Sequence, residues 1–268
     1  MAENGLFPVT YARHGDRHWK RFSSYHFAET QHACPIVEKE TLLVAAAFPI
    51  VFRNNEGSIE PVALLSLKAD SLTPFVSNDG QWLAAYVPSA LRCPPFQAGW
   101  PIQPECSPQL LVDESSGLVT DSSEDEPFFT DAGELTAELS NVLRFISARE
   151  AAVIETRSLC DVIQGLDLLK PMAGYENVAL STGYLSLDTR RMNTLSQAEK
   201  HALFDVGAIQ LLHAHQVSLS HIAWLSRVQE RLGRPKPTSQ YTENSEISHF
   251  LYAMADARNE ELFVIGEV

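Results

Sequence analysis

Hydrophobic residues in the first half of the chain occur in short runs that turn-forming residues separate. Residues 38–47 have the spacing of a short helix. Residues 50–52 and 62–67 flank the turn sequence Asn-Asn-Glu-Gly at 54–57, which predicts a β-hairpin. Two further strands are predicted, at 82–87 and at 110–112.

The second half of the chain has hydrophobic residues at helical spacing. A long amphipathic helix is predicted over residues 136–159. Ser196 and Glu199 form a capping-box pattern at the start of a helix over 197–205. The remaining predicted elements are helices at 208–216, 220–232 and 247–257, an isolated strand at 183–188, and a terminal strand at 262–265. We expect the last helix and the terminal strand to pack back on the body.

These elements predict an α+β fold, with a β-rich N-terminal part that includes a Pro- and aromatic-rich loop region, followed by a helical C-terminal part. Residues 1–135 form the β-rich part with an acidic loop, and residues 136–232 form the helical part. Residues 233–268 form a linker, a short helix and the terminal strand. One continuous domain is also compatible with a length of 268 residues.

Charge is distributed unevenly along the chain, which has a net charge of −14. Residues 105–138 contain acidic residues and no Lys or Arg, whereas residues 190–236 carry more basic than acidic side chains. The total argues against binding of nucleic acid or anionic lipid by the whole surface. An anionic partner at the basic helical end is less strongly excluded.

The sequence also predicts the cellular location of the protein and the state of its cysteines. The N-terminus has no secretory signal pattern, and the longest apolar run, residues 41–52, is too short to span a membrane, so a cytoplasmic location is expected. Export by a signal-independent route stays open. The scattered cysteines predict buried free thiols rather than disulfides or a zinc site, and they are Cys34, Cys93, Cys106 and Cys160. No cofactor is expected.

An unusual set of aromatic residues follows residue 80. We call this set the aromatic shelf, and it consists of Trp82, Tyr86, Arg92, Phe96 and Trp100. Aromatic and Arg side chains dominate binding hot spots, so the shelf is the candidate site for a peptide, a small ligand or a protein partner. The alternative interpretation is an irregular loop that covers the core.

Histidines raise the question of a metal site. His14 and Asp16 form an HxD pair that, with a distant histidine, has the composition of a two-His, one-carboxylate iron site. A solvated N-terminal segment is the competing interpretation and is preferred. His213 and His215 point to opposite sides of a helix and cannot share a metal, so these histidines and His221 are expected in the core or at an interface.

Residues 203–228 also have the outline of a helix-turn-helix DNA-binding motif. The expected recognition helix is mostly apolar where base contacts should lie, which argues against that interpretation. The basic residues of this helix region lie at its C-terminal end, where positive charge interacts favourably with the helix dipole, or where it forms a basic surface. They are Arg227, Arg231 and Arg234.

The order of several motifs resembles the SapC family of bacterial proteins, over residues 13–232. The segments that carry the resemblance are 37–52 (VEKETLLVAAAFPIVF), 79–96 (DGQWLAAYVPSALRCPPF), 110–117 (LLVDESSG), 128–136 (FFTDAGELT), 182–195 (TGYLSLDTRRMNTL) and 207–225 (GAIQLLHAHQVSLSHIAWL). Cys93 and Pro94 stand where a bulkier residue is expected. The resemblance implies a link to bacterial surface layers, from which the family takes its name.

The family resemblance further implies genes located near those of outer-membrane receptors, flavin-dependent halogenase-like proteins and cupin-like oxygenases. It carries no catalytic residue over to this chain. A peptide-transporter permease shares the family's name but is unrelated, and the absence of a predicted membrane span excludes it.

The leading hypothesis is an accessory or interaction protein that binds a peptide, a small ligand or a protein partner through the aromatic shelf. One alternative is an enzyme, or the partner subunit of an enzyme, in metal-dependent oxidation that uses His14, Asp16 and a C-terminal histidine. A second alternative is a DNA-binding regulator. The sequence leaves the oligomeric state open.

Overall fold

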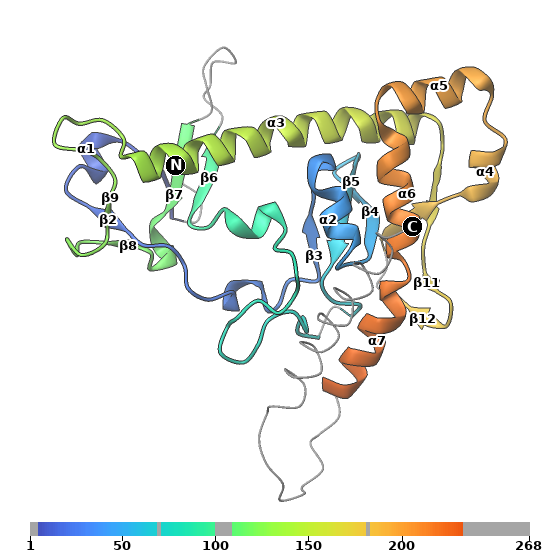
Figure 1. Ribbon diagram of the computed structural model, residues 1–268, viewed down its shortest axis with the longest axis horizontal. Helices are drawn as coiled ribbons and strands as arrows, with labels where there is room; N and C mark the ends of the chain where they lie inside the picture. The colour runs from blue at the N-terminus through green and yellow to red at the C-terminus, as the bar shows by residue number, and fades with distance from the viewer. Residues whose placement is uncertain (1–4, 69–70, 100–108, 181–182, 233–268) are drawn as a thin grey trace, which may run out of the picture.

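The computed structural model describes residues 5–68, 71–99, 109–180 and 183–232 (Figure 1). Its sheets come mainly from the N-terminal part and its longer helices from the C-terminal part, so the predicted α+β class is confirmed. Within the described residues, no helix combines the length and the apolar composition that a membrane crossing requires.

The main sheet has five strands in the order β10-β13-β4-β5-β3, and every neighbouring pair is antiparallel. Its strands are β3 (Ala33–Pro35), β4 (Ile50–Asn55), β5 (Ser58–Leu64), β10 (Leu169–Pro171) and β13 (Tyr184–Leu187). The predicted hairpin is confirmed as β4–β5, and Glu56 and Gly57 both have positive φ (52° and 91°) at its turn. Positive φ at two turn residues matches the right-handed twist of the strands that they connect.

Two sequence predictions about strands are wrong. The strand predicted at 183–188 is not isolated, because β13 pairs with β4 on one side and with β10 on the other. The segment 82–87 is not a strand, and Trp82 makes one isolated bridge with Val76. There the indole Nε1 of Trp82 donates a hydrogen bond to the carbonyl oxygen of Tyr86 at 2.8 Å, which ties the segment into a turn.

Two smaller sheets lie at the other end of the molecule. One has the order β1-β7-β6 and consists of β1 (Leu6–Pro8), β6 (Phe96–Gly99) and β7 (Gln109–Asp113). The other has the order β8-β2-β9 and consists of β2 (His18–Trp19), β8 (Val119–Thr120) and β9 (Glu126–Pro127). Strand β7 confirms the prediction at 110–112. These sheets enclose a small core with Trp19, Phe96 and Phe128 at its centre.

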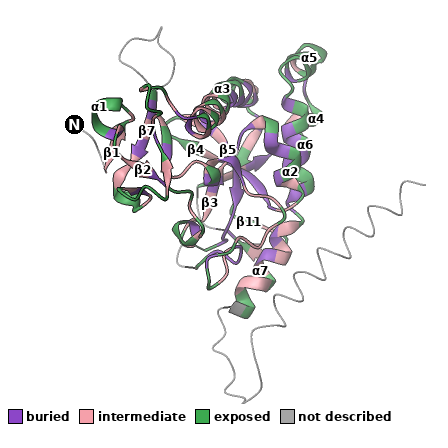
Figure 2. Cartoon of the chain, turned by 60° about the vertical axis from the view of Figure 1, so that its left-hand side comes forward, coloured by how far each residue is buried: buried purple, intermediate pink, exposed green. Residues whose placement is uncertain are grey.

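The helix α3 (Ala137–Gly165) runs past both cores (Figures 1 and 2). It begins where predicted, with the Thr136 hydroxyl accepting a hydrogen bond from the Leu139 N–H at 3.3 Å, and it extends beyond the predicted end. Its first half buries Ile146 in the small core, and its second half buries Leu159 and Ile163 against the main sheet. At 1.5 Å per residue the helix is about 43 Å long.

The short helices of the N-terminal part are α1 (Tyr11–His14), η1 (His26–Ala28), η2 (Glu38–Glu40), α2 (Thr41–Ala45), η3 (Ser89–Arg92) and η4 (Glu114–Ser116). Together η2 and α2 confirm the helix predicted at 38–47. A two-stranded hairpin, β11 (Gly174–Tyr175) and β12 (Val178–Ala179), follows β10.

The last described helices are α4 (Thr189–Asn193), α5 (Gln197–Asp205), α6 (Ala208–Ser218) and α7 (His221–Leu232), and α6 packs on β4 and β13 of the main sheet (Figure 1). The predicted capping box is confirmed, since Ser196 and Glu199 exchange side chain–backbone hydrogen bonds at the start of α5. The elements predicted at 247–257 and 262–265 lie outside the described residues.

Candidate functional site

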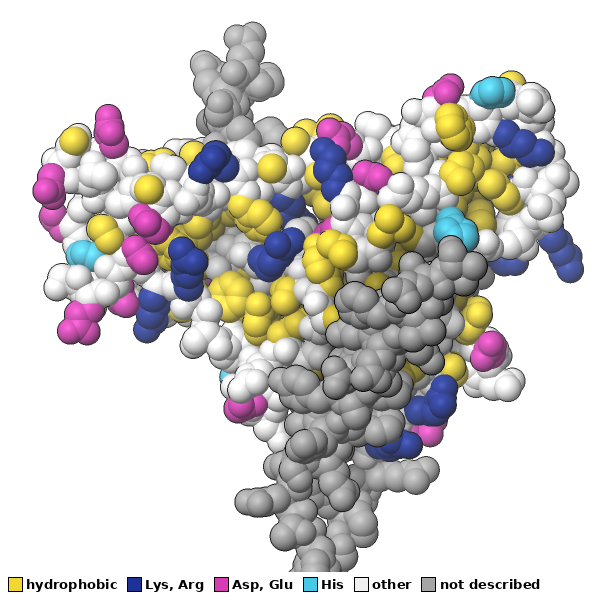
Figure 3. Space-filling model, viewed as in Figure 1, with side chains coloured by type: hydrophobic (Ala, Val, Ile, Leu, Met, Phe, Trp, Pro, Cys, Tyr) yellow, Lys and Arg dark blue, Asp and Glu magenta, His cyan; other side chains and the backbone are white. Residues whose placement is uncertain are grey.

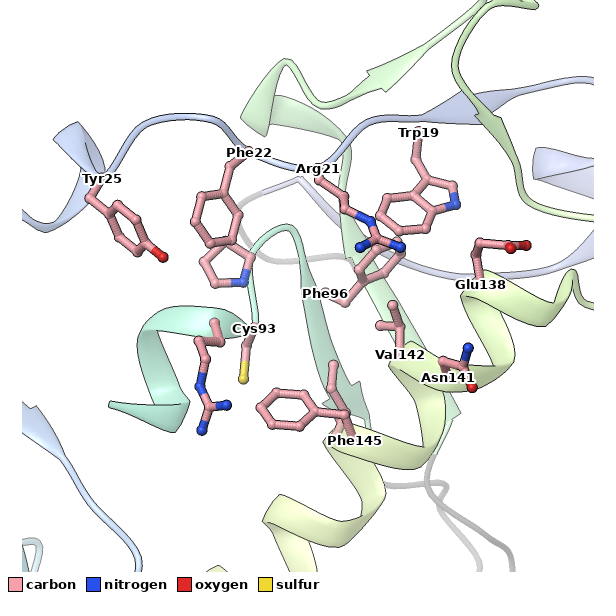
Figure 4. A pocket seen from close by; sticks show the side chains of 13 residues that line it. Trp19, Arg21, Phe22, Tyr25, Cys93, Phe96, Glu138, Asn141, Val142 and Phe145 are labelled. Atoms are coloured by element: carbon pink, nitrogen blue, oxygen red, sulfur yellow. The ribbon is translucent and has the colours of Figure 1, made fainter. Parts of the chain in front are cut away.

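A cavity of about 430 Å³ opens between α3 and the loop that follows β2 (Figure 4). Three segments line it. The loop contributes Arg21, Phe22 and Tyr25, and α3 contributes residues between Glu138 and Ile146. The turn between η3 and β6 contributes Arg92, Cys93, Pro94 and Phe96. We call this cavity the α3 groove. Side chains from the loop and from α3 face each other across it, which gives room for a ligand between them.

The floor of the α3 groove is aromatic and rigidly packed. Trp19 and Phe96 meet edge to face with ring centroids 5.0 Å apart, and both are almost completely buried. Phe145 and Val142 of α3 extend this apolar surface toward the opening and are half-buried. Because these rings are fixed by the small core beneath them, the floor keeps its shape without a ligand.

Two arginines border this apolar floor. The guanidinium carbon of Arg92 lies 5.1 Å from the ring centre of Phe145 and 5.7 Å from that of Tyr86, and Arg92 donates a hydrogen bond to the Tyr86 hydroxyl at 3.3 Å. Arg21 lies on the loop side and is exposed. In Figure 3, hydrophobic side chains gather in a hollow below α3, with Lys or Arg side chains among them. The groove therefore presents the positive charge of these two arginines beside an apolar surface, with the Glu138 carboxylate on its α3 side.

A buried carboxylate holds Tyr86, and through it Arg92, in place. The Tyr86 hydroxyl donates to Glu40 at 2.8 Å, and the same carboxylate accepts hydrogen bonds from Ser89 and Val37. Burial raises the pKa of Tyr86 to about 12, and the hydrogen bond to Glu40 adds to that shift. The Tyr86 phenol is therefore neutral at ordinary pH. Its oxygen accepts the hydrogen bond from Arg92 and so orients the guanidinium.

The members of the aromatic shelf do not form a single surface. Phe96 is in the floor of the α3 groove and Arg92 is at its border, while Tyr86 lies behind Arg92. Trp82 instead packs against Tyr25, Phe48 and Phe75 at the edge of the main core. Trp100 lies outside the described residues.

Several groove residues were missed by the sequence analysis. Trp19, Phe22 and Tyr25 belong to an aromatic-rich stretch that also contains Arg21, a composition similar to that of the aromatic shelf. That composition was the available signal. Phe145 gave none, because a phenylalanine at helical spacing predicts a core position as readily as a groove.

A second cavity, of about 520 Å³, shares Cys93, Pro94 and Phe96 with the α3 groove and lies toward η4. Its polar lining includes Arg149, which pairs with Glu150 at 3.2 Å. The turn before β6 therefore contributes to both cavities.

The HxD pair does not form a metal site with a C-terminal histidine. His14 is buried, its Nδ1 accepts a hydrogen bond from the Thr10 N–H at 3.3 Å, and its Nε2 lies 3.2 Å from Glu114. Asp16 is exposed, and α1 lies at the opposite end of the molecule from α6 and α7 (Figure 1). The described residues hold no group of three or more His, Cys, Asp or Glu side chains arranged to bind a metal.

The N-terminal segment is not simply solvated, which corrects the interpretation preferred from the sequence. Arg13 makes a two-point ion pair with Glu114 at 2.6 and 3.0 Å, and Arg17 reaches Glu114 at 3.4 Å and Asp121 at 3.2 Å. Hydrogen bonding by Arg13 lowers the pKa of Glu114. Part of the acidic segment is thus neutralised by arginines from the start of the chain.

The C-terminal histidines and arginines have different surroundings. His215 is buried, as expected, and lies between the Ile50 carbonyl oxygen at 2.7 Å and the Leu187 N–H at 3.2 Å. The N-terminal half of α7 packs Ile222 and Leu225 into the core. Arg227 and Arg231 are exposed on α7, and Arg234 lies outside the described residues.

The fold and the site define an α+β protein with an apolar, arginine-bordered groove of ligand size between a long helix and two small sheets. The chain belongs to the SapC family, since the family model described as SapC matches residues 9–225. This confirms the resemblance found in the sequence. No curated protein and no solved structure matches the chain.

Proposed function

We propose that this SapC-family chain is a binding protein whose α3 groove takes a ligand that combines a large apolar group with a negative charge. The observation that carries the proposal is the position of Arg21 and Arg92 beside the aromatic floor. An apolar group that enters the groove gains about 25 cal/mol per Å² of buried apolar surface. A carboxylate, sulfonate or phosphate on the same ligand gains charge-assisted hydrogen bonds from the arginines.

The support for Arg92 as an anchor comes from its fixed position. Its guanidinium is stacked near Phe145 and hydrogen-bonded to Tyr86 before any ligand arrives. A side chain that is already ordered loses little conformational entropy on binding, so more of the interaction energy contributes to affinity. On the α3 wall, Glu138 and Asn141 add polar groups that suit the N–H groups of a peptide. A small anionic molecule and an extended peptide segment both fit this chemistry.

A matched pair of dyes tests the proposal. The probes are 1-anilinonaphthalene-8-sulfonate, which is apolar and anionic, and N-phenyl-1-naphthylamine, which is similar in shape and uncharged. We expect both to bind the native protein, with fluorescence titration giving one saturable site. Phe145→Ala weakens both probes because it removes part of the floor.

Arginine variants separate the contribution of charge to dye binding from the contribution of apolar contact. Arg92→Gln is expected to weaken binding of the sulfonate about tenfold, which corresponds to about 1.4 kcal/mol, and to leave the uncharged dye unchanged. Arg190→Gln, an exposed arginine on α4, is the control and changes neither. Equal affinity of the sulfonate for the native protein and for Arg92→Gln would reject the role of Arg92.

A further inference from the structure

The described structure leaves a group of large apolar side chains exposed on neighbouring helices. Leu42 and Leu43 of α2 are 60% and 57% exposed, and Val217 of α6 is 56% exposed. Phe204 and Ile209 continue the group at the corner between α5 and α6. Helix α6 packs against both α2 and α5, and Figure 3 shows hydrophobic side chains over α2 and over this corner on one face. We call this group the α2/α6 face.

Exposed apolar side chains on neighbouring elements of a folded protein are typical of an interaction site. Ile209 and Val217 are eight residues apart and lie on one side of α6, where the polar residues Gln210, His213 and Gln216 are also exposed. That side does not point into the core, which Leu211, Leu212 and Ala214 fill. The α2/α6 face therefore combines exposed apolar side chains of α2, α5 and α6 that lie outside the core.

We infer that the α2/α6 face is covered by the C-terminal segment of the same chain, through residues 247–257. The sequence ISHFLYAMADA places Ile247, Phe250, Leu251 and Met254 at intervals of three and four, which is the apolar stripe of an amphipathic helix. Such a stripe is not stable as a helix alone in water at this length and requires an apolar surface to pack on. The α2/α6 face offers one.

The connection is long enough for this contact. Helix α7 follows α6 directly, and the His221 Nε2 lies 3.0 Å from the Ala45 carbonyl oxygen at the end of α2, so α7 begins beside the α2/α6 face and ends about 18 Å further along its axis. Between Leu232 and the amphipathic stretch lie the fourteen residues 233–246. When extended they span about 45 Å, which exceeds the length of α6 and α7 combined at 1.5 Å per residue.

Tethering favours the same arrangement, whereas charge does not contribute to it. Residues 237–268 contain one basic residue, Arg258, and six acidic residues, which are Glu243, Glu246, Asp256, Glu260, Glu261 and Glu267. The helices that form the α2/α6 face carry little net charge: α2 and α6 have no charged side chain, and α5 has Lys200 together with Glu199 and Asp205. An amphipathic segment tethered close to an apolar surface of the same chain experiences a high effective concentration of its binding site.

Hydrogen–deuterium exchange on the full-length protein tests this inference independently of ligand binding in the α3 groove. We expect amides of residues 247–257 to exchange at least tenfold more slowly than in an unstructured peptide. Leu43→Ser with Val217→Ser changes exposed side chains, so the body stays folded, and exchange of residues 247–257 rises to the unstructured rate. Phe250→Ser with Leu251→Ser has the same effect from the other side of the contact.

Leu72→Ser serves as the matched control, because Leu72 is 60% exposed but lies in the segment after β5 and outside the α2/α6 face. It leaves the exchange of residues 247–257 slow. Unstructured exchange rates for these residues in the native protein would overturn the inference, as would protection that survives Leu43→Ser with Val217→Ser. Protection that grows with protein concentration, together with a dimer in light scattering, would assign the face to a second copy and also overturn it.

Discussion

Substitution of Glu40 by glutamine tests the buried carboxylate that positions Tyr86. Glu40 is 4% exposed, and its two oxygens accept four hydrogen bonds. One oxygen receives the Val37 N–H at 3.1 Å and the Ser89 hydroxyl at 2.7 Å, and the other receives the Tyr86 hydroxyl at 2.8 Å and the Ser89 N–H at 2.7 Å. All four donors point at the carboxylate oxygens of one side chain, which accept hydrogen bonds from both sides.

Glutamine cannot satisfy this set in either orientation of its amide. The amide NH₂ must replace one of the two oxygens, and each oxygen faces one hydroxyl and one backbone N–H. The hydroxyls of Ser89 and Tyr86 can rotate and accept, but the backbone N–H cannot. One buried N–H therefore loses its acceptor, which costs about 1–3 kcal/mol, and the remaining bonds lose their charge assistance. We expect Glu40→Gln to lower the free energy of unfolding by about 2–4 kcal/mol.

Urea unfolding monitored by circular dichroism measures this loss as a lower midpoint at an unchanged slope. The control is Glu38→Gln, two residues earlier in the same short helix and partly exposed, which we expect to change the free energy of unfolding by less than about 0.5 kcal/mol. If Glu40→Gln unfolds within about 0.5 kcal/mol of the native protein, the four hydrogen bonds do not require a charged acceptor and the reasoning is refuted.

Three further predictions concern other buried or capping groups. Burial lowers the pKa of His215 to about 4, below the unfolded value of about 6.5, so about 3 kcal/mol of the free energy of unfolding is present above pH 6.5 and is lost as the pH falls toward 4. The urea midpoint of His215→Gln should therefore fall less steeply across this pH range than that of the native protein. Burial raises the pKa of Cys34 and Cys160 to about 12, so iodoacetamide at pH 8 should label both thiols only after denaturation. Peptide mass spectrometry measures the labelling, and labelled thiols in the native protein would contradict their burial. Ser196→Ala removes the cap of α5 and should cost about 1 kcal/mol in urea unfolding, whereas Ser196→Asp should retain most of the stability.

Local signals predicted most of the helices and the central hairpin, because caps and turns are encoded by neighbouring residues. Ser196 with Glu199 and the turn before Gly57 are examples, and both are confirmed. The partners of β13 could not be predicted in this way, since alternation indicates a strand but not the strand that it pairs with. The strand predicted at 82–87 is wrong because an aromatic residue such as Trp82 suits a strand and a buried turn equally well.

The candidate site was predicted less completely than the fold. Arg92 and Phe96 were identified from composition, and they line the α3 groove. Their neighbours Trp19 and Phe145 come from segments more than forty residues away on either side, and no local pattern connects them. His14 was expected to be solvated because the residues around it are polar. Its burial depends on Glu114, one hundred positions later, and on Phe128, whose ring packs against the imidazole.

The long helix α3 couples the stability of the groove wall to that of the main core. The same unbroken helix forms one wall of the groove and, further along, completes the main core with Leu159 and Ile163. Fraying of the main core releases the C-terminal half of the helix and loosens the wall at its other end, because helical segments gain and lose order cooperatively. If the proposed ligand binds Val142 and Phe145, its binding free energy would stabilise the whole helix and so oppose local unfolding of the distant main sheet.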